Sequence, residues 1–314
     1  MLKDLLETKH CFKLVCGAGN EDVEDIKRLV YVYSIAGCRF FDLSANEEVV
    51  KIAREALDLA KVYDAYLCVS FGIKNDPHVN KAVIDYNRCV NCGACEDICP
   101  EGAIHYGKVK KIKCIGCGRC WSVCSRAAIS YVSEEKNLED VLPSLVDIGI
   151  DCIEFHAMGL DEEEIVSKWK YLNDNYDGLL GICTSRGKLS DEALIDRIKR
   201  MIDSRESYST IVQADGFPMS GGNDNYKSTL QAVATAEIVQ NAKLPVYIML
   251  SGGTNAKTSE LAKMCEISYD GIAIGSYARK IIRQCIERPD FWTNPRVLEK
   301  ALTFAKPLVD SVIL

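Results

Sequence analysis

Eight of the sixteen cysteines form two copies of one spacing, in which four thiols are separated by two, two and three residues. Cysteines two residues apart can bind neighbouring irons of a single cubane, and four thiols at this spacing are typical of a [4Fe-4S] cluster. Two complete sets therefore predict two clusters. The first set is Cys89, Cys92, Cys95 and Cys99, and the second set is Cys114, Cys117, Cys120 and Cys124.

The two sets follow the pattern of bacterial two-cluster ferredoxins, in which the fourth cysteine of each set usually binds the other cluster. We therefore assign Cys124 to the cluster of the first set and Cys99 to the cluster of the second. Structural zinc and disulfides are the alternatives, but zinc sites rarely use four cysteines at this spacing, and still more rarely twice. Gly93, Gly116 and Gly118 lie among the cysteines and allow the backbone to approach the sulfides.

Length and composition limit the class of protein. The 314 residues suggest about two domains, at roughly 150 residues each. A net charge of −7 argues against a general nucleic-acid binder. No stretch approaches the roughly 18 apolar residues that span a bilayer. The first ten residues carry four charged side chains and no apolar run, which argues against a secretory signal.

The other eight cysteines are scattered singly, and most lie in apolar patterns typical of small buried residues. Together with the absence of a signal, they predict a cytoplasmic protein in a reducing compartment, without a membrane or nucleic-acid partner. These cysteines are Cys11, Cys16, Cys38, Cys68, Cys152, Cys183, Cys265 and Cys285.

Outside the cysteine sets, short apolar runs alternate with longer charged runs that have apolar residues three or four positions apart, as strands and helices do. Eight such units predict an α/β protein with a closed (β/α)8 TIM-like barrel. An open Rossmann-like sheet is the alternative, but the first strand is not followed by Gly-x-Gly-x-x-Gly. The predicted strands are 12–16, 39–44, 65–71, 152–156, 179–184, 210–215, 246–250 and 271–274. The predicted helices are 22–36, 47–63, 138–148, 161–173, 191–204, 228–240 and 259–265, followed by a final pair.

The cysteine sets interrupt this alternation between the third strand and the third helix. We predict a barrel domain from 1–79 and 133–314, and a small ferredoxin-like α+β insert over 80–132. A loop that follows a barrel strand lies at the C-terminal face, where the active sites of this fold are found. A segment of this size buries little core, so the clusters must hold it together. The alternative is a ferredoxin module attached to the surface without coupling to the barrel.

Polar residues recur near the C-terminal ends of the predicted strands, at positions that alternation turns toward the barrel interior. Asp42, Glu154, His156 and Asp215 are our candidates for acid–base or ligand-orienting roles. An unpaired buried polar group costs about 1–3 kcal/mol. A bound ligand explains such a ring of polar groups more readily than stability does, and a self-satisfied polar plug is the alternative.

Glycines after the last two strands suggest a second site. Loops seven and eight of this fold commonly bind phosphate with backbone N–H groups and a helix N-terminus. Gly252, Gly253, Gly275 and Ser276 are the candidates for binding a phosphate of FMN or of a phosphorylated substrate; glycines in ordinary turns are the alternative. The turn-rich segment 215–222 is a candidate lid over the mouth.

Several longer motifs resemble the LdpA family, whose best-known members are iron–sulfur proteins that feed redox state to the cyanobacterial circadian clock. The resemblance covers nearly the whole chain; its ferredoxin part is generic, and its other motifs are more specific. It implies two clusters and a barrel-like remainder, and it supplies no catalytic residue. Besides the two cysteine sets, the motifs are Val15-Cys16-Gly17-Ala18-Gly19, Gln213-Ala214-Asp215-Gly216-x-Pro218-Met219-Ser220-Gly221, Ser251-Gly252-Gly253-Thr254-Asn255 and Gly275-Ser276-Tyr277-Ala278-Arg279.

These observations predict an iron–sulfur oxidoreductase that passes electrons between two [4Fe-4S] clusters and a phosphate-bearing small molecule at the barrel mouth. A low-potential electron donor or acceptor protein would be its partner. The alternative is a redox sensor of the LdpA type that catalyses nothing. A polar mouth favours the enzyme, and an occluded apolar mouth favours the sensor.

Overall fold

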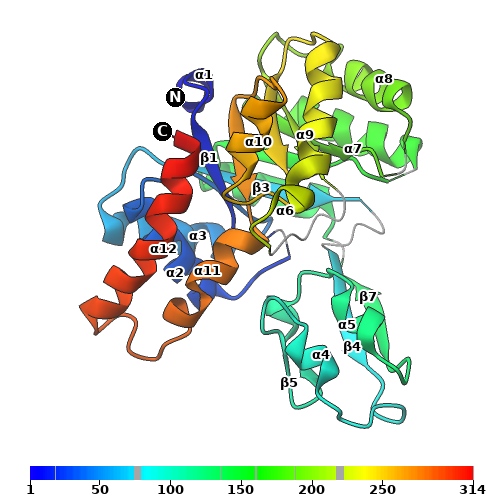
Figure 1. Cartoon of the computed structure of the whole chain (residues 1–314). Helices are drawn as coiled ribbons and strands as arrows, with labels where there is room; N and C mark the ends of the chain where they lie inside the picture. The colour runs from blue at the N-terminus through cyan, green and yellow to red at the C-terminus, as the bar shows by residue number, and fades with distance from the viewer. Residues whose placement is uncertain are drawn as a thin grey trace.

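The computed structural model describes residues 1–17, 19–73, 79–134, 136–159, 161–187, 189–216 and 223–313. Eight parallel strands close into a barrel in the order β1-β2-β3-β8-β9-β10-β11-β12, with β12 pairing with β1 (Figure 1). This confirms the predicted (β/α)8 barrel and excludes the open Rossmann-like sheet. The strands are β1 (Cys11–Val15), β2 (Phe40–Ser44), β3 (Tyr66–Gly72), β8 (Cys152–His156), β9 (Leu179–Ser185), β10 (Thr210–Asp215), β11 (Tyr247–Ser251) and β12 (Gly271–Ile274).

Helices cover the outside of the barrel, and their apolar faces form one large core with the outward residues of the strands. Most begin at an Asp, Asn or Ser whose side chain accepts a backbone N–H of the first turn, as Asp22 does from Asp25. The helices are α2 (Val23–Ile35), α3 (Glu47–Ala60), α6 (Leu138–Asp147), α7 (Glu162–Asn175), α8 (Asp191–Ile202), α9 (Tyr226–Asn241), α10 (Thr258–Met264), α11 (Ser276–Ile286) and α12 (Pro295–Ile313). None of the helices in these described ranges is both long and apolar enough to cross a membrane.

A short helix that the sequence analysis did not predict, α1 (Leu2–Glu7), packs against the N-terminal end of the barrel. Its buried Leu2 and Leu6 join an apolar layer to which all eight barrel strands contribute. Six residues are too few to show a helical period in the sequence, so only this contact reveals the helix. The layer contains Cys11, Phe40, Cys68, Cys152, Leu179, Ile211, Tyr247, Met249 and Ala273.

The insert leaves the barrel after β3 and returns before α6, and it projects from the barrel as a separate lobe (Figure 1). β4 (Asn80–Ile84) pairs with β7 (Ile129–Ser133), so the two ends of the insert lie side by side. Between them lie α4 (Ala94–Asp97), the short pair β5 (Ile104–His105) and β6 (Lys108–Val109), a 3-10 turn (Lys111–Lys113) and α5 (Arg119–Val123). Its apolar core is small and consists of Ala82, Ile84, Ala103, Ile104 and Ile129 together with cysteines.

Candidate functional site

The eight cysteines of the insert line two cavities, four in each. The first cavity is lined by Cys89, Cys92, Cys95 and Cys124. The second is lined by Cys99, Cys114, Cys117 and Cys120. This is the grouping that the crossed assignment requires, in which each fourth cysteine joins the other set. All sixteen cysteines lie in described residues and none is disulfide-bonded, so both cavities fit a cluster held by four thiolates.

Backbone geometry around the thiols also fits clusters. The amide of Ala103 donates to Cys99 Sγ at 3.3 Å and that of Ala128 to Cys124 Sγ at 3.3 Å. Similar bonds reach Cys89 and Cys114. Such N–H···S contacts tune the potential of iron–sulfur centres. The three glycines among the cysteines, Gly93, Gly116 and Gly118, have φ values of 81°, 67° and 80°, which other residues rarely adopt.

Burial makes two thiols of the second cavity harder to ionise. Burial raises the pKa of Cys117 and of Cys120 above the usual range. Bound iron would supply the charge that holds them as thiolates. In the first cavity, backbone N–H donors, with that of Ala128 foremost, lower the pKa of Cys124.

A buried ion-pair cluster joins the insert to α11 of the barrel. Glu101, two residues after Cys99, receives Arg279 Nη2 on Oε1 at 2.7 Å and Arg283 Nη2 on Oε2 at 2.6 Å. Burial opposes ionisation of Glu101, but the two guanidinium groups hold its pKa below the usual value. Arg279 also donates to the carbonyl of Val15 at the end of β1, at 2.6 Å. Arg279 is the last residue of one of the family motifs, and it therefore links this motif to a carboxylate of the insert.

Lys81 forms a second buried connection. Its ammonium donates to the carbonyl of Gly19, in the loop after β1, at 2.6 Å, and to the carbonyl of Cys114 at 2.8 Å. The backbone of Glu21 donates to Ile112 nearby, at 2.7 Å. These contacts place the second cysteine set next to the C-terminal face of the barrel.

A cavity of about 80 Å³ lies where the insert meets the barrel mouth. Ser44 at the end of β2, Ser70 near the end of β3, and Lys81 are among the residues that line it. Ser44 Oγ is buried and has no hydrogen-bond partner among the described residues. A polar cavity with an unsatisfied hydroxyl is suited to a small polar ligand or ordered water.

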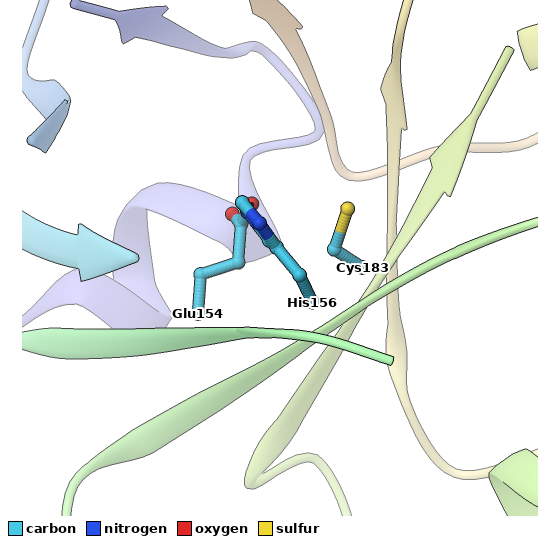
Figure 2. A group of neighbouring side chains, drawn as sticks. All are labelled: Glu154, His156 and Cys183. Carbon is cyan, nitrogen blue, oxygen red and sulfur yellow. The ribbon is translucent and has the colours of Figure 1, made fainter. Parts of the chain in front are cut away.

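Inside the barrel, the four predicted acid–base candidates Asp42, Glu154, His156 and Asp215 are all buried. Asp42 and Glu154 offer carboxylate oxygens within 4.8 Å of each other, and Asp215 is linked to the same group through Cys183. Glu154 and His156 are adjacent, with Oε1 and Nε2 separated by 3.3 Å (Figure 2). Asp42 accepts a hydrogen bond from Ser70 at 2.6 Å. Asp215 accepts one from the thiol of Cys183, a residue that the sequence analysis treated as a small buried hydrophobe.

Lys13 is a buried charged residue of the barrel interior that was not among the candidates predicted from the sequence. It lies in the middle of β1, is buried, and its ammonium donates to Glu154 Oε2 and to Gln213 Oε1, the latter at 3.2 Å. It also lies 5.1 Å from the centroid of the Phe40 ring, a favourable cation–π distance. A lysine within an otherwise apolar strand could have indicated an interior ion pair, because a buried ammonium requires a partner.

The carboxyl groups of the barrel interior differ in pKa because their surroundings differ. Burial opposes ionisation of Glu154, but Lys13 and His156 lower its pKa to about 2. Burial raises the pKa of Asp42 to about 6 and that of Asp215 to about 7. Glu154 therefore stays ionised near neutral pH, while Asp42 and Asp215 can carry protons there.

The same interaction keeps Lys13 charged. Burial alone would lower its pKa, but Cys68, Glu154 and Asp42 raise it well above the usual value. We attribute most of this effect to Glu154, because burial also raises the pKa of Cys68 and keeps that thiol neutral. The barrel interior therefore holds a buried ion pair in its middle layer.

The predicted phosphate loops have a partly structural explanation. Gly252 packs against Gly216, and a Cβ at either position would come within 2.6 Å of the backbone of the other. Gly253 also has a positive φ, 78°. Gly275 and Ser276 begin α11, and a Cβ on Gly275 would lie 3.2 Å from Arg279 Nη1. Phosphate binding by these four residues stays a prediction, and residues 217–222 of the candidate lid lie outside the described residues.

Comparisons with known proteins agree with this architecture. The model of the Light dependent period A C-terminal domain matches residues 144–311, and that of a 4Fe-4S binding domain matches residues 82–105. The protein named Light dependent period A from Synechococcus elongatus is 30% identical over 331 residues, covering 98% of this chain and 92% of the relative. The cysteine segment therefore contains a domain that binds a [4Fe-4S] cluster.

Solved structures are similar in the barrel. The YdjI aldolase from Escherichia coli K12 is 8% identical, with a TM-score of 0.50 and coverage of 99% of this chain and 91% of that one. Tryptophan synthase subunit alpha from Legionella pneumophila is 10% identical, with a TM-score of 0.49 and coverage of 99% and 97%. At this level of identity the likeness to the aldolase concerns the fold alone.

Proposed function

The chain belongs to the LdpA family, and we propose that it is an iron–sulfur redox protein whose insert exchanges electrons with a small molecule at the barrel mouth. Bound [4Fe-4S] clusters would supply one-electron transfer at low potential. The observation that carries this proposal is the pair of cysteine-lined cavities in a lobe attached to the C-terminal face of the barrel.

The chain's own residues would hold the redox groups and the ligand close together. The eight thiolates and their backbone N–H donors would fix two clusters. Lys81 touches the second cysteine set through the carbonyl of Cys114 and also lines the cavity beside Ser44 and Ser70. A ligand in this cavity would therefore contact the same lysine that supports the second set, and its charge would be felt there.

The ligand would be a small phosphate-bearing molecule, either FMN or a phosphorylated substrate. Gly252, Gly253, Gly275 and Ser276 would hold its phosphate, because α11 begins at this point and presents backbone N–H groups. The polar interior below would orient the remainder. Electrons would come from, or pass to, a low-potential carrier protein.

A reductive titration of anaerobically purified protein tests the proposal. The titration is followed by EPR, with and without the small molecule released from the protein and identified by mass. We expect the ligand either to be reduced without an added mediator or to shift a cluster signal. Identical signals in both samples, together with an empty mouth in a crystal structure, would contradict it.

The number of clusters and their ligands can be tested separately. Replacing Cys99 with Ala should remove iron from the site of Cys114, Cys117 and Cys120 and leave the other site intact. Cys265→Ala, at an exposed cysteine outside both cavities, is the matched control and should keep all the iron. Iron loss confined to the site of Cys89, Cys92 and Cys95 would contradict the crossed ligation.

A redox sensor without catalysis is the second candidate, and the Glu101 cluster favours it. Glu101 lies two residues from Cys99 and is buried against Arg279 and Arg283 of α11. A change of charge at the second cysteine set would act on this ion-pair cluster and bias how the insert sits on the barrel. The related protein carries the name Light dependent period A, which fits a regulatory role. Redox-dependent protection of α11 in hydrogen exchange, without turnover of any bound small molecule, would favour this reading.

A further inference from the structure

A second group of metal-ligand side chains lies inside the barrel, away from the insert. Glu154 and His156 are two residues apart in β8, so both point inward. His156 pairs in register with Cys183 of β9, whose thiol enters the same space. Figure 2 shows the carboxylate beside the imidazole, with the thiol projecting from the neighbouring strand. All three side chains are buried.

The distances suit a single ion. One donor atom from each of the three side chains lies within 4.8 Å of the other two. Glu154 Oε1 and His156 Nε2 are 3.3 Å apart. Two donors that each lie about 2.1 Å from a tetrahedral ion are separated by roughly 3.4 Å. The carboxylate and imidazole therefore already have the spacing that a shared ion requires.

We propose that Glu154, His156 and Cys183 bind a divalent cation of the zinc type, with one coordination position open. A thiolate, an imidazole and a carboxylate together favour a borderline ion such as Zn²⁺ over Mg²⁺ or Ca²⁺. Three protein ligands with an open fourth position are typical of catalytic rather than structural zinc. His156 is the last residue of β8, so the open position lies toward the C-terminal mouth, where substrates bind in this fold.

Binding requires that Cys183 lose its proton. The S–H bond breaks, a sulfur–metal bond forms, and one proton is released per ion bound. Asp215 already accepts the hydrogen bond of this thiol. Gln213 Nε2 donates to Glu154 Oε1 at 2.8 Å and fixes the orientation of the carboxylate, as a supporting residue around a metal does.

A neighbouring group of ligand-type side chains consists of Asp42, Cys68 and Glu154. We assign no metal to this group because it already lies next to the ammonium of Lys13. The ammonium of Lys13 binds Glu154 Oε2 and is also stabilised by Asp42. Lys13 and the proposed ion would thus use opposite oxygens of Glu154. The inference does not depend on the proposed redox function, because none of its ligands belongs to the insert.

Metal analysis of the full-length protein, purified anaerobically with its iron, tests the site. The protein is incubated with one equivalent of Zn²⁺ and desalted, and iron and zinc are measured by mass spectrometry. We expect about one zinc per chain with no loss of iron. X-ray absorption at the zinc edge should show one sulfur near 2.3 Å, with nitrogen and oxygen near 2.0–2.1 Å.

Variants separate this site from the cysteine sets. Cys183→Ala should lower zinc affinity at least tenfold and leave iron unchanged. Cys152→Ala removes another buried barrel thiol, in the apolar layer below, and should keep both metals. If Cys183→Ala does not fold, His156→Gln serves in its place. The proposal would be overturned if the unaltered protein held no zinc above background, or if the zinc were bound by four sulfurs. It would also be overturned if folded Cys183→Ala or His156→Gln bound zinc as fully as the unaltered protein.

Discussion

The insert and the barrel interior both bring ionisable side chains together, but the two regions stabilise these side chains in opposite ways. In the insert, the eight thiols come from short loops and one-turn helices, and the apolar core around them is small. In the barrel, Lys13, Glu154 and Gln213 stand on strands, where Lys13 and Glu154 form a buried ion pair and Gln213 hydrogen-bonds both. The insert therefore depends on its ligands for stability, whereas the barrel interior depends on its own pairing.

Removing iron should have the largest effect. Anaerobic chelation should unfold the insert, because its small core cannot offset the entropy of ordering about 50 residues. Hydrogen exchange should show lost protection in β4 and β7, with protection retained in β10. Persistent protection of β4 and β7 without iron would mean that the insert folds by itself.

The reciprocal change tests the barrel. Replacing residues 80–132 with a Gly/Ser linker should leave a folded, iron-free barrel, because all eight barrel strands lie outside this segment. Circular dichroism and a cooperative melting transition would check it. Aggregation at every linker length would show that the insert contributes to the barrel core.

Lys13→Met should have the next largest effect. It leaves the carboxylate of Glu154 buried without its cation and should cost about 3–5 kcal/mol of unfolding free energy. The double variant Lys13→Met/Glu154→Gln should recover much of this loss, because no buried charge is left unpaired. Denaturant unfolding of the iron-loaded protein measures both, and a double variant no more stable than the single one would contradict the ion-pair explanation.

Glu101→Gln should have a smaller effect, located at the junction of the two regions. It weakens charged hydrogen bonds to Arg279 and Arg283 and should cost about 1.5–3 kcal/mol. Limited proteolysis should then release the insert faster. Glu96→Gln, an equivalent change in the insert that contacts His105 and not α11, is the control and should leave the cleavage rate unchanged.

The smallest effect is expected where the chain re-enters the barrel. Asn137 caps α6 by accepting the backbone N–H of Glu139 at 3.3 Å. Asn137→Ala should cost about 1 kcal/mol, measured by denaturant unfolding, with no change in iron content. A loss of iron in this variant would show that the helix cap also positions the insert.

Features that depend on neighbouring residues could be predicted from the sequence. The spacing of the cysteines specified both sets, because ligands separated by only two or three residues are held together by the local chain. The eight strand–helix units followed from local periodicity, and each strand lies within a few residues of its predicted position. The inward positions of Asp42, Glu154, His156 and Asp215 followed from the alternation of side chains along a strand.

Which of these residues contact one another depends on the folded chain as a whole. Lys13 and Glu154 are 141 positions apart, and Lys13 and Gln213 are 200 apart. Barrel closure and strand register bring them together, and neither is visible in a single segment. The contact of Glu101 with Arg279, 178 positions away, likewise depends on how the insert docks. Cys183 was a buried hydrophobe in the sequence and became a possible metal ligand only when register placed it beside His156.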